Sequence, residues 1–259
     1  MYHLDSAYAL ASRIGEKESA IEALLGKALL YQEIGYEAGY DSVMQGLEQF
    51  GESDMAFESA CRLELTRLRG MCVSGLDKDA SALSERLAQT LGTELMRCTV
   101  ESKLLGADIL AHTGSPTDAR AELSVALGLA RRYSLGDLAA VALRRMAELE
   151  LEAGDLQAAL SHADEALRLT ASLGLPKYEY LLLAARIKEK LQDLEAGRDV
   201  YIKALDEVAD AYANCPPRLR GWFIKSKKVE NYIHHLRDFA RESAIARKVD
   251  AYKSGFNLK

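Results

Sequence analysis

Ionisable side chains that could perform acid–base or metal chemistry are scattered along this 259-residue sequence. It contains five histidines, namely His3, His112, His162, His234 and His235. The last two are adjacent, which does not place both rings on one face of a helix. Glu148 and Glu152 have i, i+4 spacing, and this fits a solvated helix face better than a catalytic pair of carboxylates. We therefore predict no catalytic site and no metal site.

The cysteines show no spacing that is typical of zinc ligands or of a disulfide framework. They are Cys61, Cys72, Cys98 and Cys215. We interpret them as reduced thiols in the core, since an unpaired cysteine behaves as a small hydrophobic residue.

A phosphate-binding loop also requires a specific pattern, in which two glycines precede a lysine and a hydroxyl residue. The nearest match is Gly26-Lys27-Ala28, where Ile21 replaces the first glycine and alanine replaces the hydroxyl residue. The sequence has no dinucleotide-binding fingerprint, no HExxH and no GxSxG. We expect no cofactor and predict that the chain is not an enzyme.

The elements that would position any site are marked by glycines at regular intervals. Gly35, Gly75, Gly114 and Gly154 lie 40, 39 and 40 residues apart, and each follows a helical pattern. A second series lies between them at Gly15, Gly51, Gly92, Gly136 and Gly174. This period indicates a helix–turn–helix unit that stacks on its neighbours. We predict about eleven helices through residue 213, or five and a half units with the half unit first.

The turns of the five units can be aligned at Gly35, Gly75, Gly114 and Gly154 and, in the fifth unit, at Gln192. Small residues then recur at fixed distances from these turns. Five residues after the turn lie Tyr40, Ala80, Ala119, Ala159 and Gly197. Seven residues further lie Leu47, Leu87, Ala126, Ala166 and Ala204, and seven before the turn lie Ala28, Leu68, Ala107, Ala147 and Ala185. Such columns indicate close helix crossings. Ser115, Pro116 and Asp118 predict a helix start after Gly114, and Asp155 predicts one after Gly154.

This pattern resembles the tetratricopeptide repeat, chiefly at the small positions and at the turn Gly154-Asp155. It departs from that repeat in lacking the usual aromatic residue and terminal proline, and in its period of about 39 residues instead of 34. The resemblance implies an all-α fold, namely a right-handed α-solenoid of antiparallel helix pairs.

A second resemblance concerns the runs Leu10–Gly15, Leu87–Gly92 and Leu169–Gly174, which are similar to the long repeats of bacterial signalling ATPases. In those proteins a regulatory helical array follows an AAA-like ATPase, often linked to a kinase, a cyclase or a LuxR-type activator. The segment Pro216–Ile224 is similar to the end of such arrays. The resemblance implies a regulatory, protein-interacting region of a larger cytoplasmic protein.

The tetratricopeptide resemblance also implies that the first helix of each unit lines a concave groove for a protein or peptide partner. The charged groove positions carried over from it are Arg69, Asp108, Arg144, Glu148 and Arg186, and Arg62 is added because it lies about two helical turns from Arg69. The leucines at these positions are Leu25, Leu29, Leu65, Leu104 and Leu182. Alternatively, the leucines are packing residues and the charges form a solvated face. The set lacks the lysine and asparagine residues that clamp an acidic C-terminal tail in chaperone-binding repeats, so we do not expect that ligand.

The two ends of the chain differ from the array that we place at residues 16–214. Residues 1–15 carry an apolar stripe of Leu4, Ala7, Tyr8, Ala11 and Ile14. This stripe predicts the second helix of a unit whose first helix is absent, so that the chain begins inside a longer protein or forms a homodimer there. The alternative is an ordinary capping helix.

The C-terminal segment, residues 215–259, is basic. Residues 216–259 hold eleven Lys and Arg against four Asp and Glu, a net charge of +7, which leaves −13 for residues 1–215. Trp222 with Lys225, Lys227 and Lys228 is a candidate site for an anionic partner such as nucleic acid. We prefer a helical cap docked on the acidic array. No apolar stretch approaches the ~18 residues of a membrane span, and we expect a cytoplasmic protein.

Overall fold

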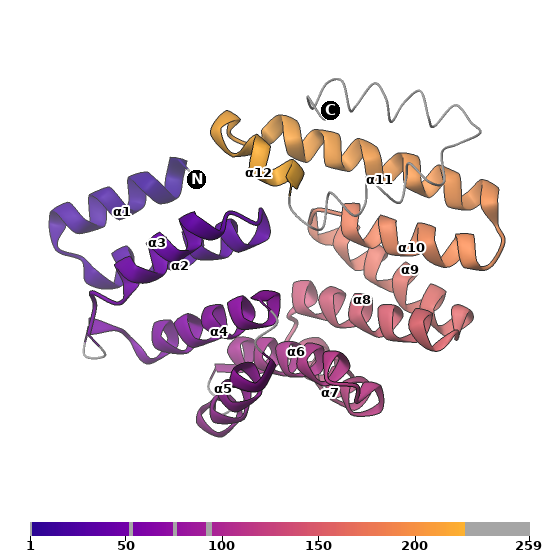
Figure 1. Ribbon diagram of the computed structural model, residues 1–259, viewed down its shortest axis with the longest axis horizontal. Coiled ribbons are helices and arrows are strands. Elements are labelled where there is room, and N and C mark those ends of the chain that lie inside the picture. The colour runs from indigo at the N-terminus through magenta and orange to yellow at the C-terminus, as the bar shows by residue number, and fades with distance from the viewer. Residues whose placement is uncertain (1, 52–53, 75–76, 92–94, 226–259) are drawn as a thin grey trace. The chain divides into compact units, whose positions relative to one another are not determined.

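The computed structural model describes residues 2–51, 54–74, 77–91 and 95–225 (Figure 1). These residues form twelve α-helices and one 3-10 helix, and they contain no strand. Eleven of the α-helices lie between Tyr2 and Asn214. The predicted all-α class is therefore confirmed.

The chain divides into two compact units, residues 1–138 and 139–259. The first contains seven complete helices: α1 Tyr2–Ile14, α2 Lys17–Glu33, α3 Glu37–Leu47, α4 Phe57–Ser74, α5 Asp77–Thr90, α6 Met96–His112 and α7 Pro116–Arg132. Helix α4 packs against both α2 and α6, while α3, α5 and α7 each pack beside the helix that precedes them. The first helices of successive pairs therefore form one row.

The second unit continues the same pattern with shorter connections. It comprises most of α8 Gly136–Ala153, then α9 Leu156–Leu173, α10 Tyr178–Lys190, α11 Leu194–Asn214, the 3-10 helix η3 Pro217–Leu219 and α12 Arg220–Lys225. Helix α10 packs against α9 and α11. Ala147, Ala163 and Ile187 belong to one buried cluster, so alanines allow α8, α9 and α10 to meet closely.

Five glycines end helices in the left-handed conformation that residues with a Cβ rarely adopt. They are Gly15, Gly35, Gly114, Gly154 and Gly174, with φ between 64° and 87°. Gln192, which the repeat alignment places with the glycines, also has a positive φ of 63°. The residue after each turn donates to the carbonyl five residues back, as Asp155 N does to Glu150 O at 2.9 Å. The aligned turns at Gly35, Gly114, Gly154 and Gln192 thus share one geometry, whereas Gly75 and Gly92 lie outside the described residues.

Two details of the predicted turns are wrong. Gly136 begins α8 and does not end α7, because the left-handed residue is Ser134 and Leu135 N closes the turn onto Ala130 O at 2.8 Å. Helix α7 does begin at Pro116, but the side chain of Ser115 makes no capping hydrogen bond. By contrast, Asp155 caps α9 as expected, with Oδ1 accepting from Ala158 N at 3.2 Å.

The alanines of these columns are buried, as the repeat register predicts. Ala80, Ala119 and Ala159 have no exposed surface, and neither do Ala28, Leu68, Ala147 and Ala185. A Cβ atom added to Gly197 of α11 would lie 3.6 Å from the carbonyl oxygen of Ala185 in α10. Residues from two of the columns therefore meet where the two helices cross.

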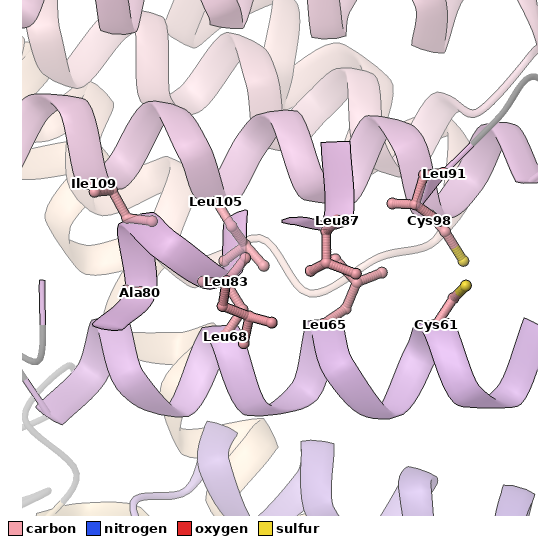
Figure 2. Packing of buried hydrophobic residues seen from close by; sticks show 10 residues of the cluster. All are labelled: Cys61, Leu65, Leu68, Ala80, Leu83, Leu87, Leu91, Cys98, Leu105 and Ile109. Carbon is pink, nitrogen blue, oxygen red and sulfur yellow. The ribbon is translucent and has the colours of Figure 1, made fainter. Parts of the chain in front are cut away.

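Leucines fill the space between α4, α5 and α6 (Figure 2). Leu65 and Leu68 come from α4, Leu83 and Leu87 from α5, and Leu105 from α6. Each fully buried leucine contributes roughly 1.5–3 kcal/mol of transfer free energy, so this layer holds the three helices together. Cys61 and Cys98 lie at one end of the cluster as free, buried thiols, as predicted (Figure 2). Cys72 and Cys215, which were also expected in the core, are only half-buried.

Helix α1 corrects the interpretation of its apolar stripe. Tyr8 packs against the cluster that contains Leu24 and Leu25 of α2, and Leu4 Cδ2 lies 3.0 Å from the position of a Cβ on Gly26. Of the three large residues expected to face an absent helix, only Ile14 is exposed, at 63%. Leu4 and Tyr8 instead use the existing surface of α2, because α1 and α2 pack as an antiparallel pair.

Candidate functional site

A groove of about 290 Å³ lies in the first unit, where α2, α4 and α6 form a row. Its lining residues are Leu25, Leu29, Glu58, Arg62, Leu65, Thr66, Arg69, Arg97, Cys98 and Glu101. The three leucines and Arg69 are positions that the tetratricopeptide resemblance assigned to a groove, and Arg62 was predicted beside Arg69. The structure therefore brings these five predicted residues together.

Helical spacing explains how α4 and α6 present their polar residues to the groove. Glu58, Arg62 and Arg69 lie at i, i+4 and i+11 on α4, so they share one face of the helix. Arg97 and Glu101 have i, i+4 spacing on α6. Two charged helix faces thus border the apolar side chains of α2.

Arg62 is fixed to the neighbouring helix by an ion pair with Glu22 of α2. Glu22 also accepts a hydrogen bond from the buried hydroxyl of Ser59 at 2.7 Å, and the same hydroxyl contacts Glu18. A serine hydroxyl has one hydrogen and donates to one carboxylate at a time. These contacts tie α4 to α2 along the edge of the groove.

Arg69 and Arg97 share one carboxylate, that of Glu101. Arg97 Nε lies 3.3 Å from Glu101 Oε1, while Arg69 Nη2 lies 3.8 Å from Glu101 Oε2. Arg97 also forms an ion pair with Asp137. Burial opposes ionisation of Asp137, but the hydrogen bond and charge of Arg97 outweigh it and hold the pKa of Asp137 below its usual value. Arg69 is therefore the more weakly held of the two arginines.

Cys98 adds a thiol to the groove wall. Burial is the main cause that raises the pKa of Cys98 to about 11, and the neighbouring Glu101, Cys61 and Glu58 raise it further than Arg62 lowers it. The side chain is consequently a neutral thiol near pH 7 and a weak nucleophile in that form.

The remaining residues of the predicted groove set are placed elsewhere. Asp108 is half-buried on α6 and does not line the groove. In the second unit Arg144 forms an ion pair with Glu148 and lies over the ring of Tyr180 at 5.9 Å, and Arg186 is exposed on α10. Arg144 is thus half-buried and its Nε also lies 3.8 Å from Glu179 Oε2, so it joins α8 to α10 as well as pairing with Glu148.

The predicted site for an anionic partner is described only in part. Trp222 lies on α12 and is 43% exposed, and Lys225 is the last residue of that helix. Lys227 and Lys228 lie outside the described residues. This site stays a prediction.

Sequence reasoning missed Glu22, Glu58, Arg97 and Glu101, which pair with or border the predicted arginines. Apart from the additional Arg62, it took only two positions from each first helix. One further helical turn before Arg62 leads to Glu58, and the i, i+4 pair Arg97 and Glu101 precedes Leu104 on the same helix. No local pattern, however, indicates that Glu22 is the partner of Arg62.

Two other titratable residues, His162 and Glu150, contact each other within the fold. His162 Nδ1 lies 2.7 Å from Oε2 of the buried Glu150, which satisfies the carboxylate. Among the described residues, no group of three or more His, Cys, Asp or Glu could hold a metal ion. In the same part of the chain no helix has both the length and the apolar character needed to cross a membrane.

Comparison with solved structures supports the helical-repeat fold. The apo form of RapI matches with a TM-score of 0.57 and 12% sequence identity, covering 97% of this chain and 69% of that one. A kinesin light chain repeat structure from Podosopora anserina, described as putative and as having nearly identical TPR-like repeats, matches with a TM-score of 0.56 and 15% identity, covering 79% of this chain and 100% of that one. BtubC (BKLC) from P. vanneervenii matches at 0.54 and 15% identity, with coverage of 99% and 93%.

These matches confirm the predicted class of TPR-like helical solenoid. No protein-family model matches the sequence, and no curated protein matches it. At 12–15% identity the likeness concerns the fold alone.

Proposed function

We propose that this chain is a non-enzymatic scaffold for protein–protein interaction, and that a peptide segment of its partner binds in the groove of α2, α4 and α6. The observation that carries the proposal is the lining of the groove, where the half-buried Leu29 lies beside Arg62 and Arg69. Leu25 and Leu65 also line the groove but are buried packing residues of the core. Apolar side chains supply binding free energy, and a few polar groups orient the ligand.

The charges of the groove favour a particular kind of peptide. Three arginines and two glutamates line it, so its lining carries a net positive charge. Arg69, whose carboxylate partner is 3.8 Å away and shared with Arg97, is the cation best able to turn toward a ligand. A partner segment with an acidic residue beside apolar ones would match both parts of the lining.

A selection experiment tests this proposal directly. The full chain is used to select binders from a phage-displayed library of random peptides, and their affinities are measured by fluorescence anisotropy. Charge reversal of Arg62→Glu with Arg69→Glu should weaken selected peptides about tenfold or more, as truncating interface anchors commonly does.

The matched control reverses two arginines that do not line the groove, in the double variant Arg86→Glu with Arg120→Glu. It changes the net charge equally and should leave affinity within about twofold, since charges outside an interface act mainly through long-range attraction. Equal losses in the two double variants would contradict the groove as the binding site. Circular dichroism of each variant shows whether the helices are retained.

We further propose that the scaffold is the regulatory region of a larger cytoplasmic bacterial signalling or transcription-regulating ATPase. The support is the likeness of Leu10–Gly15, Leu87–Gly92 and Leu169–Gly174 to the repeats of such proteins. The complete coding sequence tests this. A phosphate-binding loop upstream of Met1 is expected, and a start codon at Met1 with no preceding domain would contradict it.

A homodimer through α1 belongs to the same proposal, with Leu10 and Ile14 exposed on that helix. Sedimentation velocity of the wild type and of Ile14→Glu tests it. A concentration-dependent dimer that the variant abolishes is the expected result, and a monomer at all concentrations is the contrary one.

The second candidate function is nucleic-acid association through the basic C-terminal segment. The exposed Trp222 within that segment and the net charge of +7 over residues 216–259 favour it. Replacing Lys225, Lys227 and Lys228 by Gln should then weaken binding to mixed-sequence DNA and reduce its salt dependence by nearly one unit for each lost phosphate contact. Absence of DNA binding at physiological salt would exclude this candidate.

A further inference from the structure

Cys61 and Cys98 face each other across the contact between α4 and α6. Both side chains belong to the same buried cluster, and each residue is 4% exposed. Figure 2 shows the two sulfur atoms pointing toward one another from the two helices. Cys61 is also one of the groups that perturb the ionisation of Cys98, which agrees with their proximity. The sequence has these cysteines in different repeat units, so the helix packing creates the pair.

One member of this pair, Cys98, lies at the wall of the groove, although only 4% of its surface is exposed. Cys98 lines the groove, whereas Cys61 lies behind it in the cluster. Arg62, Arg69 and Arg97 border the same space and attract an anionic reagent. Glutathione disulfide has this character, because each of its halves carries two carboxylates and one ammonium group.

We propose that Cys61 and Cys98 are a modification site, which a glutathione-type disulfide converts to a reversible intramolecular disulfide linking α4 to α6. The inference does not depend on the proposed peptide ligand. It concerns a covalent link between two cysteines, which mass spectrometry detects without a bound peptide.

The reaction balances as two thiol–disulfide exchanges. The deprotonated sulfur of Cys98 attacks one sulfur of glutathione disulfide, forms a mixed disulfide and releases one glutathione thiolate. The deprotonated sulfur of Cys61 then attacks the Cys98 sulfur and releases the second glutathione. Two protein thiols are oxidised to one disulfide, one glutathione disulfide is reduced to two glutathione thiols, and the two protons pass through solvent to the glutathione.

The order of attack follows from the structure. Cys98 reacts first because it is the thiol that lines the groove, and Cys61 is already directed toward it. Burial keeps both thiols protonated at neutral pH and raises the pKa of each. The exchange is therefore slow at neutral pH and selective for a reagent that the groove holds next to Cys98.

The test uses the full chain with Cys72→Ala and Cys215→Ala, which leaves Cys61 and Cys98 as its two thiols. The reduced protein is incubated with glutathione disulfide, quenched with acid and alkylated. The expected product has lost two hydrogen atoms, carries no alkyl group and gives a linked Cys61–Cys98 peptide pair on digestion without reductant. Dithiothreitol should restore two alkylatable thiols, and the oxidised form should have a higher melting temperature.

The matched control adds Cys61→Ala to the same background. It should stop at a glutathione adduct on Cys98, which shows that this sulfur is reached first. Circular dichroism shows whether both proteins are folded. Oxidation of dithiothreitol in the same buffer shows that the glutathione disulfide is an active oxidant. Two thiols that remain free, adducts without the internal link, or disulfide-linked dimers in the parent variant would each overturn the proposal.

Discussion

Tyr201 of α11 is fully buried, and its hydroxyl donates a hydrogen bond to Oε2 of Glu189 in α10 at 3.1 Å. The two residues join the last long helix pair of the second unit. Burial raises the pKa of the Tyr201 phenol, and the charge and hydrogen bond of Glu189 raise it further. The phenol is therefore neutral in the folded protein over the physiological range.

Removal of this hydroxyl should destabilise the protein modestly. We expect Tyr201→Phe to lower the free energy of unfolding by about 1 kcal/mol, the usual net contribution of a buried hydrogen bond. The measurement is urea denaturation followed by circular dichroism. Tyr133→Phe serves as the control, since Tyr133 is exposed and its change should stay within about 0.5 kcal/mol. A loss of equal size in both variants would show that the Glu189 contact is not the cause.

The raised pKa also predicts alkaline destabilisation. A tyrosine whose folded pKa exceeds its unfolded value contributes stability that is complete below about pH 10 and is lost as the pH rises further, because the unfolded chain releases the proton more readily. As the pH rises from about 9 to about 11, the free energy of unfolding should fall less steeply for Tyr201→Phe than for the wild type. The two slopes should differ by at most about 1.4 kcal/mol per pH unit. Parallel stability curves for the two proteins would refute this assignment.

Two glycines inside helices should respond to alanine with opposite signs. A Cβ on Gly39 of α3 would lie 2.4 Å from Tyr36 Cδ1 and 3.0 Å from Tyr31 Cδ2, whereas one on Gly128 of α7 would meet no atom within 4 Å. Gly39→Ala should therefore cost about 1–3 kcal/mol through overpacking. Gly128→Ala should stabilise by about 0.5–1 kcal/mol through helix propensity. Thermal and urea unfolding measure both, and a shared sign would disprove the contact around Gly39.

The repeat register makes its own prediction at Ala159. This residue has no exposed surface and packs in the cluster with Ala147 and Ile187. Ala159→Leu should overpack that contact and cost about 1–3 kcal/mol. On the same helix Ala171 is exposed, and Ala171→Leu should change stability by less than about 0.5 kcal/mol. Chemical denaturation of the two variants compares them, and a neutral Ala159→Leu would mean that the column is misaligned.

Much of the fold could be predicted because its signals are local. A helix that ends in the left-handed conformation favours glycine at that position, and this signal is contained in a few neighbouring residues. Gly35, Gly114 and Gly154 therefore marked real turns. The same regularity identified Gln192, which has no glycine-like freedom but occupies the equivalent turn. Ser134 escaped detection because serine carries no comparable signal, and Gly136 two residues later attracted the assignment instead.

The site was predictable only where one helix contains the pattern. Arg69 follows from its repeat position on the first helix of a pair, Arg62 was added because it lies near Arg69 on the same helix, and both line the groove. Arg144 and Arg186 satisfy the same rule, yet the structure shows one in an ion pair with Glu148 and the other on an exposed part of α10. Spacing specifies a face of a helix, but it does not specify which charge on a neighbouring helix neutralises it.

By itself, then, the sequence determined the all-α repeat, its turns and the small residues at the helix crossings, since each depends on residues within one or two helical turns or on a periodic column. Tertiary structure alone decided the pairing of Arg62 with Glu22, the sharing of Glu101 by two arginines and the approach of Cys61 to Cys98. These contacts join different helices, and their partners depend on how far each helix rotates and slides when its apolar face is buried against the next.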